Sequence, residues 1–146
     1  IMKKNVKISR GFTILEMMVV VVIIGILASM VVPNLMGSQE RANMQKAVSD
    51  VSALETSLKM YKMDNYDYPS TDQGLEALIT LTDIEPQPRR FPEGGYVQRL
   101  PNDPWGNEYQ LLNPGENSKM DVFSMGPDGE PGTEDDIGNW NLGDYQ

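Results

Sequence analysis

The sequence predicts an α+β fold in which one long N-terminal helix packs on a small antiparallel β-sheet. Three observations support this prediction. An apolar run reaches from Phe12 to Val32 and contains a single charged residue, Glu16. Apolar residues then recur at helical spacing as far as about Met63. The rest of the chain holds short strand-like segments separated by turns rich in proline and glycine.

Length and composition narrow the range of functions. The 146 residues allow one ordinary domain with an appendage. Four basic residues and no acid occupy the first eleven positions, which leaves eight basic against 21 acidic residues in the remainder. Such an acidic remainder argues against nucleic acid as a partner, because a phosphate binder needs a basic face. The absence of cysteine and histidine excludes disulfides, the usual zinc sites and Ser-His or Cys-His nucleophile pairs.

The apolar run is long enough to cross a membrane. As a helix rising about 1.5 Å per residue, Phe12 to Val32 spans roughly 30 Å, the thickness of a hydrocarbon core. The four basic residues within positions 1–11 precede this run. The positive-inside rule therefore places the N-terminus in the cytoplasm and the rest of the chain outside. A secretory signal peptide fits less well, since no A-x-A-like cleavage site follows the run. We therefore expect residues 12–36 to form a single-pass anchor and the first half of the long helix.

Glu16 is the anomaly in this run. An ionised carboxylate in hydrocarbon costs a few kcal/mol or more and usually has a partner, yet the helix holds no basic residue beside it. Cleavage between Gly11 and Phe12 would create an α-amino group four positions before Glu16. That cation would meet Glu16 on its own chain or on a neighbouring subunit.

The N-terminal motif resembles a known signal. The leader K-K-N-V-K-I-S-R-G, followed by F-T-I-L-E and the apolar run, is similar to the type III signal of type IV pilins and pseudopilins. The resemblance implies that a prepilin peptidase cleaves after Gly11 and methylates the amine of Phe12. It also implies that Glu16 aligns subunits during filament assembly. The alternative is an ordinary single-span anchor with an accidental glutamate.

Beyond the anchor the helix becomes amphipathic. Its apolar residues recur at intervals of three and four with one adjacent pair, which predicts one buried face; they are Met44, Ala47, Val48, Val51, Leu54, Leu58 and Tyr61. One helix is therefore expected from about Phe12 to about Met63, apolar all round first and amphipathic later.

The head, residues 37–146, is expected to add a short helix and a small sheet. Ser70 and Gln73 fit a capping box that opens a helix from Ser70 or Thr71 through Leu81. The segment Glu85–Gly95 is rich in proline and glycine, which predicts a loop. The predicted strands are Tyr96–Leu100, Glu108–Leu112 and Asp121–Met125. The sheet residues expected to pack on the amphipathic helix are Tyr109, Leu111, Val122 and Phe123.

A segment dense in carboxylates, residues 124–140, follows the last predicted strand. A solvated tail would not place apolar Ile137 and Trp140 directly after the acids. A pair of catalytic carboxylates has no other support in the chain. An EF-hand starting at Asp128 fails, because Thr133 and Asn139 stand where that loop needs glycine and glutamate. A different calcium loop remains, since calcium accepts six to eight oxygen ligands in flexible geometry.

Three further stretches resemble the major pseudopilins of the type II secretion system: Tyr61–Leu78, Leu100–Leu111 and the acidic segment with I-G-N-W. That resemblance covers nearly the whole chain and implies a pilin-like fold with a C-terminal calcium loop at 124–140. The implied Ca²⁺ ligands are the side chains of Asp128, Asp135 and Asp136 and the main-chain oxygens of Met125 and Thr133. Magnesium is less expected because it prefers a strict octahedron.

The resemblance implies a structural subunit rather than an enzyme. The subunit would be anchored in the inner membrane with a periplasmic head and would polymerise into the periplasmic pseudopilus that drives protein export. Its implied partners are further copies of itself, minor pseudopilins, the inner-membrane assembly platform and the prepilin peptidase. One alternative is a type IV pilin, although such heads typically close with a disulfide. The other is a membrane-anchored calcium-binding or hydrolytic domain.

Overall fold

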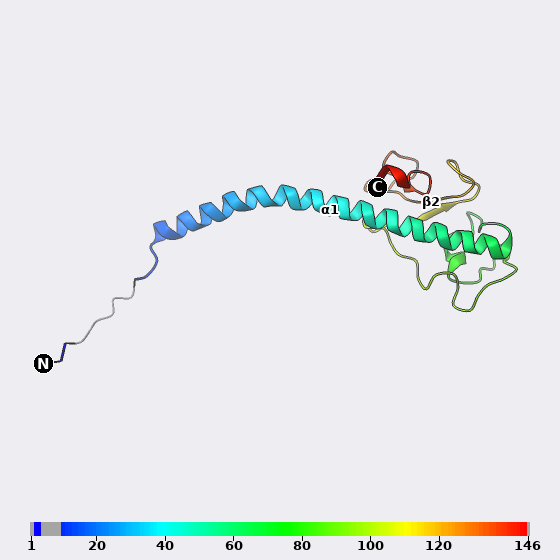
Figure 1. The fold of residues 1–146 in the computed structure, drawn as a ribbon, viewed down its shortest axis with the longest axis horizontal. Helices are drawn as coiled ribbons and strands as arrows, with labels where there is room; N and C mark the ends of the chain where they lie inside the picture. The colour runs from blue at the N-terminus through cyan, green and yellow to red at the C-terminus, as the bar shows by residue number, and fades with distance from the viewer. Residues whose placement is uncertain (1, 4–9, 146) are drawn as a thin grey trace. The chain divides into compact units, whose positions relative to one another are not determined.

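The computed structural model describes residues 2–3 and 10–145, and of residues 32–36 only the backbone. The predicted leader, residues 1–11, therefore lies largely outside the described residues. The elements follow in the order α1 (Ile14–Asn65), 3₁₀ helix η1 (Leu75–Leu78), β1 (Gln110–Leu112), β2 (Asp121–Ser124), β3 (Ile137–Gly138) and 3₁₀ helix η2 (Leu142–Tyr145) (Figure 1). This order confirms the predicted α+β fold with its long N-terminal helix. Contacts divide the chain into two units, residues 1–39 and 40–146.

The first unit contains the apolar part of α1. The window Ile14–Val31 is long and apolar enough to cross a membrane, the one such segment among the described residues. Ile14 is 83% exposed and Val21 65% exposed. No soluble core covers these side chains, as expected of a helix that lipid or another helix must cover.

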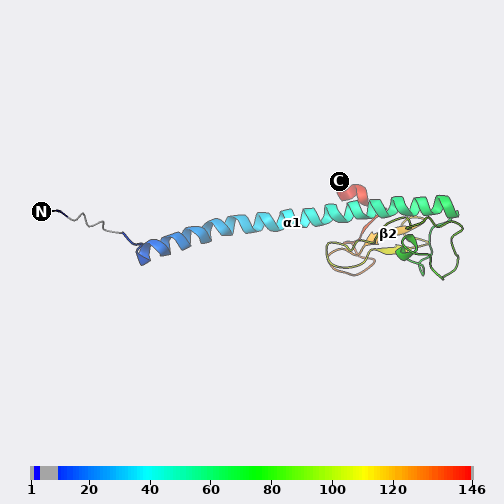
Figure 2. The same cartoon turned by 90° about the horizontal axis from the view of Figure 1, so that it is seen from below.

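The second unit is the head, in which the sheet lies alongside the C-terminal part of α1 (Figure 2). The core forms because the helical repeat of apolar residues gives α1 one continuous buried stripe. The buried residues of this core are Val51, Leu54, Leu58, Tyr61, Leu75, Ala77, Leu78, Tyr109, Leu111, Met120 and Val122. Three of the four predicted sheet contacts, Tyr109, Leu111 and Val122, are thereby confirmed.

The sheet has the order β1-β2-β3, and both pairs are antiparallel. Leu111 lies opposite Val122, and Ser124 lies opposite Ile137. All four residues of β2 are buried, because this central strand has a neighbour on each side, α1 covers one of its faces and Trp140 covers the other. The two edge strands of the sheet are therefore β1 and β3.

A cluster of polar contacts holds the sheet in place on α1. The Tyr109 hydroxyl donates to the Asp50 carboxylate at 2.7 Å, and the Lys46 ammonium contacts the same carboxylate oxygen at 2.7 Å. Lys46 also donates to the carbonyl of Asn102 at 3.2 Å. Burial, and then the hydrogen bond to Asp50, raises the pKa of Tyr109. The phenol therefore stays protonated and keeps donating.

The helix ends at Asn65 because the next residue, Tyr66, adopts φ +70°. That left-handed conformation is a common helix stop. The Tyr66 N–H closes the last turn on the carbonyl of Lys62 at 2.7 Å. The predicted end at about Met63 is correct to within two residues.

The predicted short helix from Ser70 or Thr71 through Leu81 is wrong in extent, since only η1 is helical. Ser70 and Gln73 do exchange the two hydrogen bonds of a capping box, at 2.9 and 3.2 Å. A helix does not continue from them because Gly74 adopts φ +63°. The Gln73 amide instead donates to the carbonyls of Ile84 and Pro86 and so fixes the following loop.

The predicted strand Tyr96–Leu100 is absent from the described sheet. The N–H groups of Tyr96 and Val97 both donate to the carbonyl of Leu78, at 2.7 and 3.3 Å, instead of joining a strand pair. Gly95 permits this close approach, since a Cβ atom there would lie 2.6 Å from the same carbonyl. The strand that the sequence did not predict is β3.

Phe123 does not belong to the core on α1, contrary to the prediction. Adjacent residues of a strand point to opposite faces, so Val122 faces α1 and Phe123 faces away from it. Its ring packs on Trp140 with a centroid distance of 5.6 Å. This contact covers the second face of β2 with the residues that follow the acidic segment.

Candidate assembly segment and acidic loop

The N-terminus of α1 carries a capping box that the sequence analysis missed. Glu16 N–H donates to the Thr13 hydroxyl at 3.1 Å, and Thr13 N–H donates to the Glu16 carboxylate at 3.4 Å. The spacing T-x-x-E was the available signal. Glu16 therefore has a local partner in the uncleaved chain, and it also lies in the first turn, where the helix dipole favours an anion.

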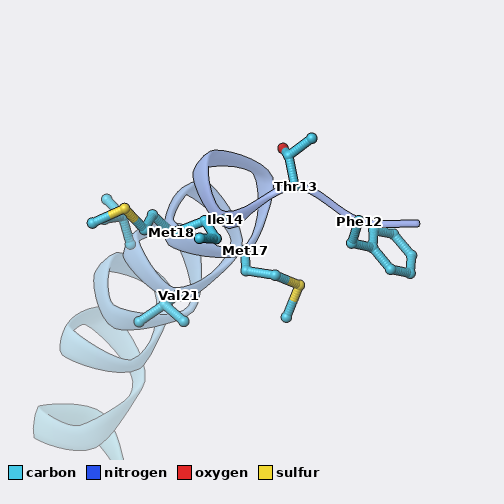
Figure 3. A pocket seen from close by; sticks show the side chains of 7 residues that line it. Phe12, Thr13, Ile14, Met17, Met18 and Val21 are labelled. Carbon is cyan, nitrogen blue, oxygen red and sulfur yellow. The ribbon is translucent and has the colours of Figure 1, made fainter. Parts of the chain in front are cut away.

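Apolar side chains surround this box on the helix surface. Figure 3 shows Met17, Met18 and Val21 projecting from the first turns, with Phe12 beyond the helix start. Phe12 is 81% exposed and Met18 62% exposed. The segment thus presents a polar spot within an uncovered apolar surface, which is the arrangement that a helix-packing partner would bury.

The acidic loop, residues 124–140, is built on glycines and on buried ends. Gly126 has φ +71°, and a Cβ atom there would collide with the Asp135 carbonyl, so the two ends of the loop meet at a residue that must be glycine. After the loop, Ile137 is fully buried against Ala47 and Val48 of α1. The apolar residues behind the acids therefore pack back on the head, as predicted.

The carboxylates of the loop are held mainly by backbone donors. Asp128 accepts from the Glu130 N–H at 3.0 Å, and this bond and one from the Thr133 hydroxyl lower the pKa of Asp128. Asp136 accepts from the Gly132 N–H at 2.7 Å and contacts the Thr133 hydroxyl at 3.4 Å. The pKa of Asp136 is raised, chiefly by burial and also by the charge of Asp128.

The structure brings some of the predicted calcium ligands together. Asp128 and Asp136 share the Thr133 hydroxyl and interact electrostatically, while the Thr133 carbonyl accepts the Asp136 N–H at 3.3 Å. Asp135 is exposed, and its charge acts on the Tyr145 hydroxyl. Within residues 2–3 and 10–145, no group of three or more acidic side chains is arranged to hold a metal ion. The oxygen chemistry fits calcium, whereas the coordination geometry is not formed.

Asp121, which the sequence predicts only as the start of a strand, forms a second carboxylate site. Asp121 is 1% exposed and accepts from the N–H groups of Glu116, Asn117 and Ser118 at 2.7 to 2.9 Å. The Ser118 hydroxyl adds a bond of 2.7 Å. Burial alone would raise the pKa of Asp121, but these bonds outweigh it and the pKa is lowered. The carboxylate thus closes the turn between β1 and β2.

Asp103 connects another turn to the start of the acidic loop. It is 4% exposed and accepts from the N–H groups of Trp105 and Asn107. Its second oxygen accepts from the Ser124 hydroxyl at 2.8 Å, and that hydroxyl accepts from the Gly126 N–H at 3.1 Å. Asp103 and Ser124 therefore fix where the loop leaves β2.

Comparisons with known proteins agree with this architecture. The family model described as type II secretion system (T2SS), protein G matches residues 34–140, and the model of the prokaryotic N-terminal methylation motif matches residues 7–32. Together they cover both units of the chain.

Curated relatives match at high identity over most of the chain. The type II secretion system core protein G of Pectobacterium carotovorum is 66% identical and covers 91% of this chain and 85% of its own. The protein of the same name from Vibrio cholerae is 59% identical over 98% of this chain and 99% of its own. The crystal structure of the major pseudopilin of the type 2 secretion system of enterohaemorrhagic Escherichia coli has a TM-score of 0.69 at 57% identity, covering 75% and 96% of the two chains. The chain therefore belongs to the protein G family of the type II secretion system, the family of its major pseudopilin.

Proposed function

We propose that the chain polymerises through its apolar helix into the periplasmic pseudopilus that drives protein export in type II secretion. The family is one of structural secretion-system subunits. The observation that carries the proposal is the uncovered apolar first part of α1, which begins at the Thr13–Glu16 capping box. Packing such helices against one another buries surface that otherwise only lipid can cover.

Before assembly, the subunit is proposed to reside in the inner membrane. The helix is inserted with residues 1–11 in the cytoplasm and the head in the periplasm, as the basic leader favours. Prepilin peptidase cleaves after Gly11 and methylates Phe12, a proposal supported by the match to the N-terminal methylation motif. The assembly platform of the inner membrane and minor pseudopilins are the further proposed partners.

Glu16 is the proposed alignment residue. After cleavage, the amine of Phe12 on an incoming subunit is a cation that the Glu16 carboxylate of its neighbour can bind within the apolar helix packing. A charge pair removed from water is strong only when both partners are present. An unpaired Glu16 in the assembled filament would therefore oppose polymerisation.

Two substitutions separate this role from helix capping. Glu16→Gln keeps the capping box, because glutamine serves at that position, but removes the charge. Glu16→Ala removes both. We expect normal cleavage and little or no pseudopilus from either variant, measured by immunoblotting of sheared filaments and of membranes. Normal filament yield from Glu16→Gln would contradict the charge pair and leave capping as the role of Glu16.

The acidic loop is proposed to bind Ca²⁺ through the carboxylates of Asp128, Asp135 and Asp136 and the main-chain oxygens of Met125 and Thr133. Hard oxygen donors suit this ion. The proposal is supported by the approach of Asp128 to the buried Asp136, two like charges that a cation would neutralise. When bound, the ion supplies positive charge to the loop. This chain's own residues close the loop at Gly126 and anchor its end at Ile137.

A further inference from the structure

A groove opens in the head beside the outer edge of β1. Three segments line it: Thr71–Glu76, Leu100–Asn102 and Glu108–Leu112. We call it the edge groove. It shares no residue with the acidic loop or with α1, so neither calcium binding nor helix packing accounts for it.

The outer edge of β1 has backbone groups that point away from the sheet. On the side of β2 away from β1, the Val122 N–H donates to the side-chain oxygen of Asn139 at 3.2 Å. The Val122 carbonyl accepts from the Asn139 N–H at 3.1 Å. Val122 therefore does not bond to its opposite residue, Leu111. In an antiparallel pair such a residue turns its own N–H and C=O outward. The N–H and C=O of Leu111 thus face the edge groove.

Asn113, two residues after Leu111, gives independent evidence that the N–H and C=O groups at alternate residues point outward from β1. Its N–H donates to the Thr71 hydroxyl at 2.9 Å, and its carbonyl accepts from that hydroxyl at 3.2 Å. Thr71 thereby takes the place of a neighbouring strand at Asn113. Along the described part of the chain, no comparable group bonds the outward N–H and C=O of Leu111.

The chain itself limits the length of this open edge. At one end Asn102 bridges to Glu108, and at the other Thr71 bonds Asn113. Between them lie four residues, which span roughly 13 Å at the usual rise of a strand. An extended segment of about four residues fills that length and can bond the open N–H and C=O of Leu111.

The charge of the edge groove selects among such segments. Its lining contains the exposed carboxylates of Asp72, Glu76 and Glu108 and no lysine or arginine. The ion pairs formed among the described residues, Lys46–Asp50 and Lys59–Glu55, leave all three carboxylates without a cation. A basic side chain is therefore the complement that the lining favours.

We propose that the edge groove binds a short extended segment of a partner protein that carries a lysine or arginine. The segment extends the sheet by pairing its backbone with the N–H and C=O of Leu111. Its basic side chain lies among Asp72, Glu76 and Glu108. The site shares no residue with the apolar part of α1 or with the acidic loop.

The test uses the full chain, labelled with ¹⁵N, in detergent micelles. The probe is the tripeptide Val-Lys-Val with acetyl and amide ends, and Val-Glu-Val is its matched control. The Leu111 amide signal is expected to shift and its hydrogen exchange to slow with the lysine peptide, with affinity on the order of tenfold above that of the glutamate peptide. An unchanged Leu111 amide at millimolar lysine peptide, or equal affinity for both peptides, overturns the proposal.

A pair of variants then tests the acidic lining. Glu76→Gln is expected to weaken binding of the lysine peptide by about two- to fivefold, the scale of one exposed ion pair. Glu93→Gln removes an exposed carboxylate outside the edge groove and is expected to bind as the parent chain does. Equal affinities for the two variants would show that the lining does not select the basic side chain. Amide signals away from the groove report that both variants remain folded.

Discussion

Two neighbouring segments of the head use buried aspartate in opposite ways. The turn between β1 and β2 surrounds Asp121 with four short hydrogen bonds from its own backbone and from Ser118, and the pKa of Asp121 is lowered. In the acidic loop, burial raises the pKa of Asp136 more than its own hydrogen bonds lower it, and the charge of Asp128 adds to the rise. The first carboxylate is satisfied by the protein. The second is the one for which a cation is proposed.

The difference follows from how many donors each turn supplies. The residues before Asp121 present consecutive N–H groups toward one carboxylate, which amounts to an anion-binding turn. The acidic loop spreads its donors over several acids: the Glu130 N–H bonds Asp128, and the Gly132 N–H bonds Asp136. Acidic composition alone therefore does not distinguish this self-contained turn from the loop for which an ion is proposed; the arrangement of donors around each carboxylate does.

The largest effect is expected at the self-contained turn. Asp121→Asn replaces one acceptor oxygen with an amide that opposes the N–H groups of Glu116 and Asn117, so the head should lose about 3 kcal/mol of stability. Urea unfolding of the full chain in detergent, followed by tryptophan fluorescence, measures this loss. Asp83→Asn, at an exposed position in the loop after η1, is the control and should lie within about 0.5 kcal/mol of the parent chain. Equal midpoints for the two variants would show that the Asp121 bonds contribute little.

The next effect belongs to the acidic loop. Calcium at about a hundred times its dissociation constant should raise the stability of the head by roughly 2.7 kcal/mol, because the proposed site exists only in the folded loop. A chelator should remove this gain, and Asp128→Ala should abolish the response to calcium. Glu130→Ala, at an exposed acid outside the proposed ligand set, should keep it. A thermal melt of the parent chain that is the same in calcium and in chelator would rule out the site.

The smallest effect is expected from acid. The folded pKa of Asp121 lies below its unfolded value, so its contribution is complete above the unfolded pKa of about 3.9 and is lost as the pH falls through the folded pKa. In chelator, the parent chain should therefore lose stability below about pH 4 more steeply than Asp121→Asn does. Parallel pH profiles for the two chains would indicate that Asp121 is not the group responsible.

Several elements were predictable because their signals are local. The spacing of apolar residues from Met44 to Tyr61 specifies one helix face, and the fold confirms it. The T-x-x-E and S-x-x-Q spacings specify hydrogen bonds over three residues, and both form. The helix predicted after Ser70 failed because the conformation of Gly74 turns the chain toward a distant loop. The helix propensity of residues 75–81 contains no information about the bond between Gln73 and that loop.

By itself the sequence determined the long helix, its change from apolar to amphipathic, the strands β1 and β2, and the grouping of acids before Ile137. These features depend on periodicity and composition, which act over a few residues. Only the tertiary structure decided that β3 joins the sheet, that Phe123 faces Trp140, and that β1 keeps an open edge. Each of these depends on which distant backbone groups meet, because a hydrogen bond between segments is made or left open by the packing of the whole head.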